Sequence, residues 1–176
     1  DSVGVRDSDW GGDQRDRRST SGGVWFLGNH CIKTWSSTQG AYALSSAEAE
    51  FYAMIDAVTR AKGLISLAKE LGFTDLENVV HIRTDSSAAK SFVSRRGLGK
   101  MRHVEIRDLW LQKEVSEGKL EVYKLKGEDN PADLMTKYLS RKKIDGCLAT
   151  ICQGHQAGRA DMGLNIQKGS AVNPSS

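Results

Sequence analysis

Four acidic residues, spread over most of the chain, stand where a strand is expected to end or a helix to begin: Asp7, Glu50, Asp85 and Asp133. Carboxylates that reach one point from separate elements suit hard divalent cations such as Mg²⁺, or Mn²⁺ in its place, because these ions prefer oxygen ligands. Two such ions can activate a water molecule and stabilise a departing oxygen in phosphodiester hydrolysis. The acids therefore predict a metal-dependent nuclease that acts on a polyanionic backbone.

The elements that would position these acids follow from the pattern of apolar residues and turn signals. A short loop at 28–30 joins two strands into an antiparallel hairpin, whereas a helix between later strands implies a parallel crossover. The expected order is βββαβααβα, an α/β fold. Strands are expected at 3–9, 23–27, 31–36, 79–84 and 119–125, and helices at 47–71, 86–93, 103–117 and 131–139.

The phase of the long helix at 47–71 separates its two early acids. Ser45 and Glu48 form a capping box at its start. Glu50 shares a helical face with Met54 and Ala57, so it should point inward, whereas Glu48 should be solvated. A carboxylate on an inward face needs a partner, because burying it unpaired costs several kcal/mol. A metal ion is one possible partner and an arginine is another.

The other acids are supported by different arguments. Asp85 ends a strand that should be central, and ligand sites in open α/β sheets lie beyond the carboxyl ends of parallel strands. Asp133 stands early in a helix capped by Asn130, so it could instead simply favour the helix dipole. Asp7 and Asp9 lie on the same side of the first strand. Strand alternation therefore leaves Asp9 as an alternative to Asp7.

Length and composition favour one compact domain over 1–140, followed by a flexible tail over 141–176, where glycines interrupt any sustained periodicity. A net charge of +3 permits nucleic-acid binding without requiring it. The three cysteines have no disulfide-type spacing, which favours an intracellular setting. We expect no membrane segment. Because the chain begins at Asp1, almost directly with a strand, we expect a fragment of a longer polypeptide.

Seven motifs, in order, make the chain resemble the ribonuclease H domain that follows the reverse transcriptase in copia-type long-terminal-repeat retrotransposon polyproteins. They are residues 7–13 (DSDWGGD), 17–22 (RRSTSG), 35–37 (WSS), 43–51 (ALSSAEAEF), 84–88 (TDSSA), 102–107 (RHVEIR) and 132–137 (ADLMTK). The resemblance implies an RNase H-like mixed five-stranded sheet flanked by helices. It also implies two Mg²⁺ ions that serve hydrolysis of the RNA strand of RNA–DNA hybrids during reverse transcription.

The resemblance further implies a role for each acid. Asp7 would bridge both ions, Glu50 and Asp85 would hold the ion on the leaving-group side, and Asp133 would hold the ion on the nucleophile side. The implied partners are the hybrid and the preceding reverse transcriptase. The implied location is intracellular, either in a cytoplasmic retrotransposon particle or in the nucleus.

Basic and hydroxyl residues could contact phosphates of the hybrid, although runs of charge are commonly just solvated loops. The four tryptophans are expected to pack in the core. Two other functions remain open, a catalytically inactive remnant that still binds nucleic acid and a segment that only supports the polymerase. The candidate phosphate contacts are Arg17, Arg18, Ser19, Arg102 and His103.

Overall fold

The computed structural model of the chain describes residues 2–12, 15, 17–97 and 109–154. A five-stranded sheet with the order β3-β2-β1-β4-β5 forms the centre of the fold. Strands β1, β2 and β3 are antiparallel neighbours, and β4 and β5 continue the sheet in parallel with β1. The predicted mixed sheet is thereby confirmed. The strands are β1 (Ser2–Asp9), β2 (Thr20–Leu27), β3 (His30–Thr38), β4 (Val80–Thr84) and β5 (Leu120–Lys124).

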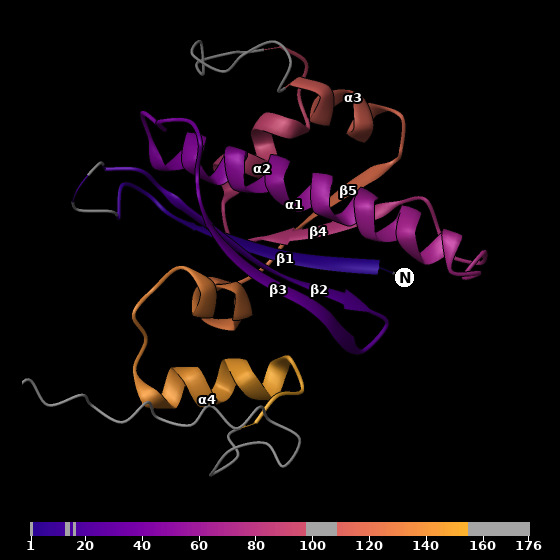
Figure 1. The fold of residues 1–176 in the computed structure, drawn as a ribbon. Coiled ribbons are helices and arrows are strands. Elements are labelled where there is room, and N and C mark those ends of the chain that lie inside the picture. The colour runs from indigo at the N-terminus through magenta and orange to yellow at the C-terminus, as the bar shows by residue number, and fades with distance from the viewer. Residues whose placement is uncertain (1, 13–14, 16, 98–108, 155–176) are drawn as a thin grey trace, which may run out of the picture.

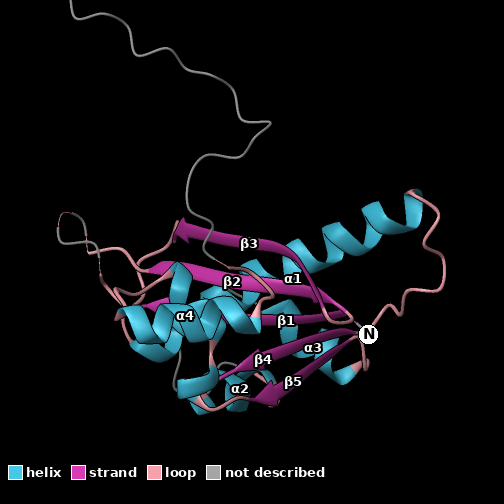
Figure 2. Cartoon of the chain, turned by 90° about the horizontal axis from the view of Figure 1, so that it is seen from below, coloured by secondary structure: helices cyan, strands magenta, loops and turns pink. Residues whose placement is uncertain are grey.

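Helices cover both faces of this sheet (Figure 1). The long helix α1 crosses one face together with α2 and α3, whereas α4 lies on the opposite face, in front of the strands in Figure 2. Two short 3-10 helices, η2 and η3, connect β5 to α4. The helices are α1 (Ser46–Glu70), α2 (Ser87–Val93), α3 (Trp110–Ser116), η2 (Gly127–Asp129), η3 (Pro131–Met135) and α4 (Arg141–Thr150).

The core between α1 and the sheet fixes the position of the helix. Met54, Ala57 and Ala61 are fully buried along one face of α1, as its helical phase predicts. Phe51 lies one position after Glu50 and packs edge-on against Phe92 of α2, with the ring centroids 4.6 Å apart. Burial of an aromatic ring stabilises a fold by about 1.5–3 kcal/mol. This packing therefore holds the first turns of α1, and with them Glu50, at one end of the sheet.

Two expectations about the end of the chain are wrong in part. The helix predicted to run to residue 139 is only the short 3-10 helix η3, because the backbone N–H groups of Thr136 and Lys137 both bond to the carbonyl of Asp133 and close the turn. The predicted tail from 141 onward begins with the helix α4, which buries Cys147 and Ile151. One i, i+4 pair is too little to give a visible periodicity. Residues 155–176 lie outside the described part of the chain.

Tryptophan packing is confirmed for three residues and wrong for one. Trp25 and Trp35 are buried in the core, and Trp110 is partly buried against it. Trp10 is 53% exposed, because its indole N–H donates to the carbonyl of Ala43 at the surface and not into the core. Within the described residues, no helix has the length and apolar character needed to cross a membrane.

Candidate active site

Three of the predicted acids meet at one end of the sheet. Asp7, Glu50 and Asp85 each present a carboxylate oxygen, and these oxygens lie within 4.8 Å of one another. The geometry follows from topology, since β1 and β4 are parallel neighbours with Val5 paired to Arg83. Their carboxyl ends therefore place Asp7 and Asp85 side by side, and α1 brings Glu50 over them.

Glu50 has a buried arginine as its partner, one of the two possibilities that its inward face left open. The guanidinium of Arg6 pairs with the Glu50 carboxylate and donates to its backbone carbonyl. It also donates to Oγ1 of Thr84 at 2.8 Å. Burial lowers the pKa of Arg6 below its usual range, while the charges of Glu50 and Asp85 oppose that shift. Ser8 donates to the second carboxylate oxygen of Glu50 at 2.8 Å.

Asp7 is held from the opposite face of the sheet. The hydroxyl of Thr136 donates to Oδ2 at 2.5 Å, and Nζ of Lys137 lies 3.2 Å from Oδ1. Nδ2 of Asn130, which caps η3 through its Oδ1, donates to the carbonyl of Arg6 at 3.3 Å. Burial raises the pKa of Asp7 to about 6, although the hydrogen bond from Thr136 and the charge of Lys137 act in the other direction.

Asp133 lies next to this group without joining it. It is buried in η3, and its Oδ1 lies 2.9 Å from Nζ of Lys137, one helical turn further along. Burial would lower the pKa of Lys137, but the hydrogen bond to Asp133 and the charge of Asp7 raise it above the usual value. The structure therefore connects the fourth acid to the other three through an ammonium group.

The two acids that competed with these candidates take other positions. Asp9 turns toward Gly12, where an added Cβ would lie 1.8 Å from the Asp9 carboxylate, and it is not a member of the three-acid group. Glu48 is buried, so its expected solvation is wrong. Its carboxylate turns back to accept from the N–H of Leu44 and the hydroxyl of Tyr52, both at 3.0 Å. Capping, not helical phase, decides its burial.

The candidate phosphate contacts are placed only in part. Ser19 is buried and its hydroxyl accepts from the N–H of Gly11 at 3.1 Å, so it shapes the turn after β1. Arg18 lies over the ring of Tyr42, 5.2 Å from its centroid, and Arg17 is exposed with a left-handed backbone (φ 60°). Arg102 and His103 lie outside the described residues.

Sequence reasoning missed the groups that orient the acids. Strand alternation carries a usable signal for Arg6, because a basic residue between Val5 and Asp7 in a central strand must be buried and paired. Thr136 and Lys137 stand in a motif of the resemblance but had no role assigned. Their contact with Asp7 spans about 130 residues of sequence, and no local pattern reports such a contact.

The donor set fits a divalent cation. Carboxylate oxygens from Asp7, Glu50 and Asp85 are the hard ligands that Mg²⁺ and Mn²⁺ prefer. Their mutual proximity costs energy through like-charge repulsion unless cations compensate it. Arg6 and Lys137 supply two positive charges against four acids, which leaves the site with a net negative charge.

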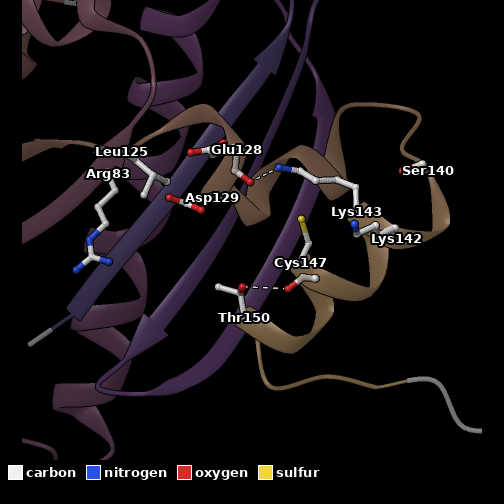
Figure 3. A pocket seen from close by; sticks show the side chains of 10 residues that line it. Arg83, Leu125, Glu128, Asp129, Ser140, Lys142, Lys143, Cys147 and Thr150 are labelled. Atoms are coloured by element: carbon white, nitrogen blue, oxygen red, sulfur yellow. Dashed lines mark hydrogen bonds between the residues drawn. The ribbon is translucent and has the colours of Figure 1, made fainter.

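A separate cavity of about 580 Å³ lies between α4 and the β4–β5 side of the sheet. Figure 3 shows Arg83, Glu128 and Lys143 around it, with Lys143 donating to the carbonyl of Glu128. None of the four acids lines this cavity. Its mixed charges give no arrangement comparable to the acid site.

Comparison with known proteins relates the chain to transposon polyproteins. No family model matches it. The chain is 31% identical over 144 residues to the retrovirus-related Pol polyprotein from transposon TNT 1-94 of Nicotiana tabacum, covering 82% of this chain and 11% of that protein. It is also 32% identical over 146 residues to the Pol polyprotein from transposon RE1 of Arabidopsis thaliana, covering 82% of this chain and 10% of that protein. The chain thus spans about a tenth of these relatives' length.

The structure is similar to that of RNase H1 from the halophilic archaeon Halobacterium salinarum NRC-1, with a TM-score of 0.51 and 16% sequence identity. The similarity covers 76% of this chain and 92% of the archaeal chain. At this identity the comparison shows a common fold, and the polyprotein matches supply the relationship in sequence. The chain therefore has the ribonuclease H fold and is similar in sequence to one segment of the retrovirus-related Pol polyproteins of transposons, which fits a ribonuclease H domain of such a polyprotein.

Proposed function

We propose that the chain is a metal-dependent ribonuclease H that hydrolyses the RNA strand of RNA–DNA hybrids during reverse transcription of a retrotransposon. The observation that carries this proposal is the meeting of carboxylates from β1, α1 and the end of β4 within 4.8 Å on a ribonuclease H fold. The similarity to Pol polyproteins supports the hybrid as substrate and the reverse transcriptase of the same polyprotein as partner.

The four acids would hold two Mg²⁺ ions. Asp7, Glu50 and Asp85 would hold one ion, and Asp133 together with Asp7 would hold the other. When bound, such ions lower the pKa of a water nucleophile and neutralise charge on the departing oxygen. The protein's own contribution is to fix the ligands. Arg6 and Ser8 hold the Glu50 carboxylate from one side of the sheet, and Thr136 holds that of Asp7 from the other.

Selectivity for a hybrid would come from the turn after β1. Gly11 adopts a left-handed backbone (φ 60°), and the hydroxyl of Ser19 accepts its N–H. The backbone groups of Gly11 and Gly12, which follow β1 directly, are suited to reading 2′-hydroxyls, the feature that separates RNA from DNA. Arg17 and Arg18 add positive charge for phosphates next to this turn.

The test is cleavage of an end-labelled RNA–DNA hybrid at millimolar Mg²⁺, with double-stranded DNA of the same sequence as a substrate control. The variant Asp85→Asn should lose cleavage by roughly 100-fold or more, because even partners outside the ligand set typically contribute 10–100-fold. Asp75→Asn, which alters an exposed acid in the loop after α1, is the matched control and should retain activity. Cleavage that survives in Asp85→Asn contradicts the assigned site. Hybrid binding without cleavage in the unmodified chain indicates an inactive binding remnant instead.

A further inference from the structure

Lys137 occupies the space between Asp7 and Asp133. Its Nζ lies 2.9 Å from Oδ1 of Asp133, and 3.2 and 3.1 Å from Oδ1 and Oδ2 of Asp7. The ammonium therefore touches three carboxylate oxygens from two acids. A cation in this place neutralises the two acids in the same way as a divalent ion between them would.

The contacts of Asp7 show what this arrangement excludes. Both of its carboxylate oxygens are within reach of Lys137, and Oδ2 also accepts from Thr136. Asp133, the acid on the far side of the ammonium, is not part of the group formed by Asp7, Glu50 and Asp85. An ion shared by Asp7 and Asp133 would compete with Nζ for these oxygens, because Mg²⁺ binds its oxygen ligands at about 2.1 Å and the ammonium already contacts three of them.

The two cations of the site differ in their freedom to leave. Arg6 is completely buried and is held by Glu50 and Thr84. The side chain of Lys137 is 39% exposed and has a flexible four-carbon stem. It can therefore move to solvent or to a nearby phosphate without opening the fold. Arg6 is a fixed counter-ion, whereas Lys137 is exchangeable.

We propose that Lys137 is an internal counter-cation that competes with a divalent ion for the oxygens of Asp7 and Asp133. The free protein takes up one ion, at Asp7, Glu50 and Asp85, and a second only after Lys137 moves away. A phosphate of bound nucleic acid is a suitable acceptor for the released ammonium, since charged hydrogen bonds to phosphate are strong. Binding of nucleic acid and of the second ion are then coupled. This inference rests on the proposed function, because it assigns an order of events to the same acids.

The number of ions bound without nucleic acid tests the proposal. Mn²⁺ is titrated into the metal-free protein, and bound ions are counted by calorimetry and by the electron paramagnetic resonance signal of free Mn²⁺. The unmodified chain should bind one ion. Lys137→Met, and Lys137→Gln as a second variant that keeps polarity, should bind two, or bind the second at least tenfold more tightly. Lys137→Arg should behave as the unmodified chain.

Lys124→Met is the matched control. Lys124 is exposed and donates to the backbone carbonyl of Asp85, so its loss changes the charge near the first ion without freeing Asp133. It should alter affinity but leave one ion per chain. Adding Asp133→Asn to Lys137→Met should abolish the second ion.

Identical isotherms for Lys137→Met, Lys137→Gln and the unmodified chain would overturn the counter-cation role while leaving the nuclease proposal intact. A gain of the second ion that survives Asp133→Asn would overturn it as well. An unmodified chain that binds no Mn²⁺ at all contradicts the proposed function itself. Circular dichroism of each metal-free variant verifies that the fold is kept.

Discussion

Because the pKa of Asp7 is raised, we expect removal of its charge to stabilise the fold. This is opposite to the usual effect of removing a buried polar contact. Replacing Asp7 by asparagine keeps the shape of the side chain and one acceptor oxygen, which can still accept from Thr136, while an NH2 group replaces the oxygen that faces Lys137. The substitution removes a charge that burial disfavours, since the pKa of Asp7 rises from 3.8 to about 6. We expect Asp7→Asn to unfold at higher denaturant concentration than the unmodified chain while losing cleavage.

The magnitude follows from linkage. Between pH 4 and 6 the folded chain binds a proton at Asp7 that the unfolded chain has already released, so stability falls as pH rises through this interval. The full penalty applies above the folded pKa and amounts to about 3 kcal/mol, at 1.36 kcal/mol per pKa unit. Because Lys137 loses one of its two acids in the variant, this figure is an upper bound. Below about pH 4 the difference should vanish.

The assay is equilibrium urea unfolding in the presence of a chelator at pH 4.0 and 7.5. A gain of about 1–3 kcal/mol at pH 7.5 and none at pH 4.0 is expected, which corresponds to roughly 2–4 °C in melting temperature for each kcal/mol in a chain of this size. Asp75→Asn, at an exposed position, controls for the general effect of removing one negative charge. An Asp7→Asn variant that is less stable at pH 7.5, or equally stabilised at both pH values, would refute the reasoning.

Three further predictions concern the groups around Asp7 and Glu50. Glu50→Gln should abolish hybrid cleavage, whereas Glu48→Gln should retain it, because Glu48 only caps α1. Equal loss of cleavage by the two variants in a gel assay would contradict the different roles of Glu50 and Glu48. Gly22→Ala should lower the free energy of unfolding in urea by about 1–3 kcal/mol and reduce cleavage, since the added Cβ would lie 2.6 Å from Cβ of Met135 and displace η3. An unchanged free energy of unfolding would contradict this prediction. Asn130→Ala should lower the free energy of unfolding by about 1–3 kcal/mol in the same assay, because the substitution removes the cap of η3 and the hydrogen bond from Asn130 to β1. A change below about 0.5 kcal/mol would contradict this prediction.

The framework of the fold could be predicted from sequence because its signals are local. Alternation and β-branched residues located the five strands, and the capping box located the start of α1. The inward phase of Glu50 was visible because Met54 and Ala57 repeat at the helical period over a long element. The short helix α4 buries only Cys147 and Ile151. So small an apolar face gives no pattern that exceeds the background of a glycine-interrupted segment.

The acids of the candidate site could be predicted from sequence, but the groups that orient them could not. Their positions at element ends are a property of each segment, so Asp7 and Asp85 could be placed at one sheet edge from topology alone. The choice between Asp7 and Asp9 depended on the three-dimensional position of the turn at Gly12, which alternation does not encode. The contacts of Thr136 and Lys137 with Asp7 depend on how η3 crosses the sheet. That crossing is set by Gly22, where the absence of a side chain admits Met135 and Thr136.

The two cations that contact the acids explain how the cluster can fold without metal and still bind the ions that we propose for it. Without compensation, four acids in partly buried positions would raise one another's pKa values and take up protons. Arg6 reduces this repulsion permanently at Glu50. Its buried Nε has no hydrogen-bond partner within the described structure, which costs some free energy of folding. Lys137 reduces it reversibly at Asp7 and Asp133, from a side chain that solvent reaches. Two fixed cations would neutralise the acids permanently, so a second divalent ion would gain little electrostatic attraction from binding there. An arrangement without either would raise the pKa of Asp7 further, because the charge of Lys137 lowers it in the present structure. The pairing of one fixed with one exchangeable cation therefore suits a site that folds first and takes up the proposed ions afterwards.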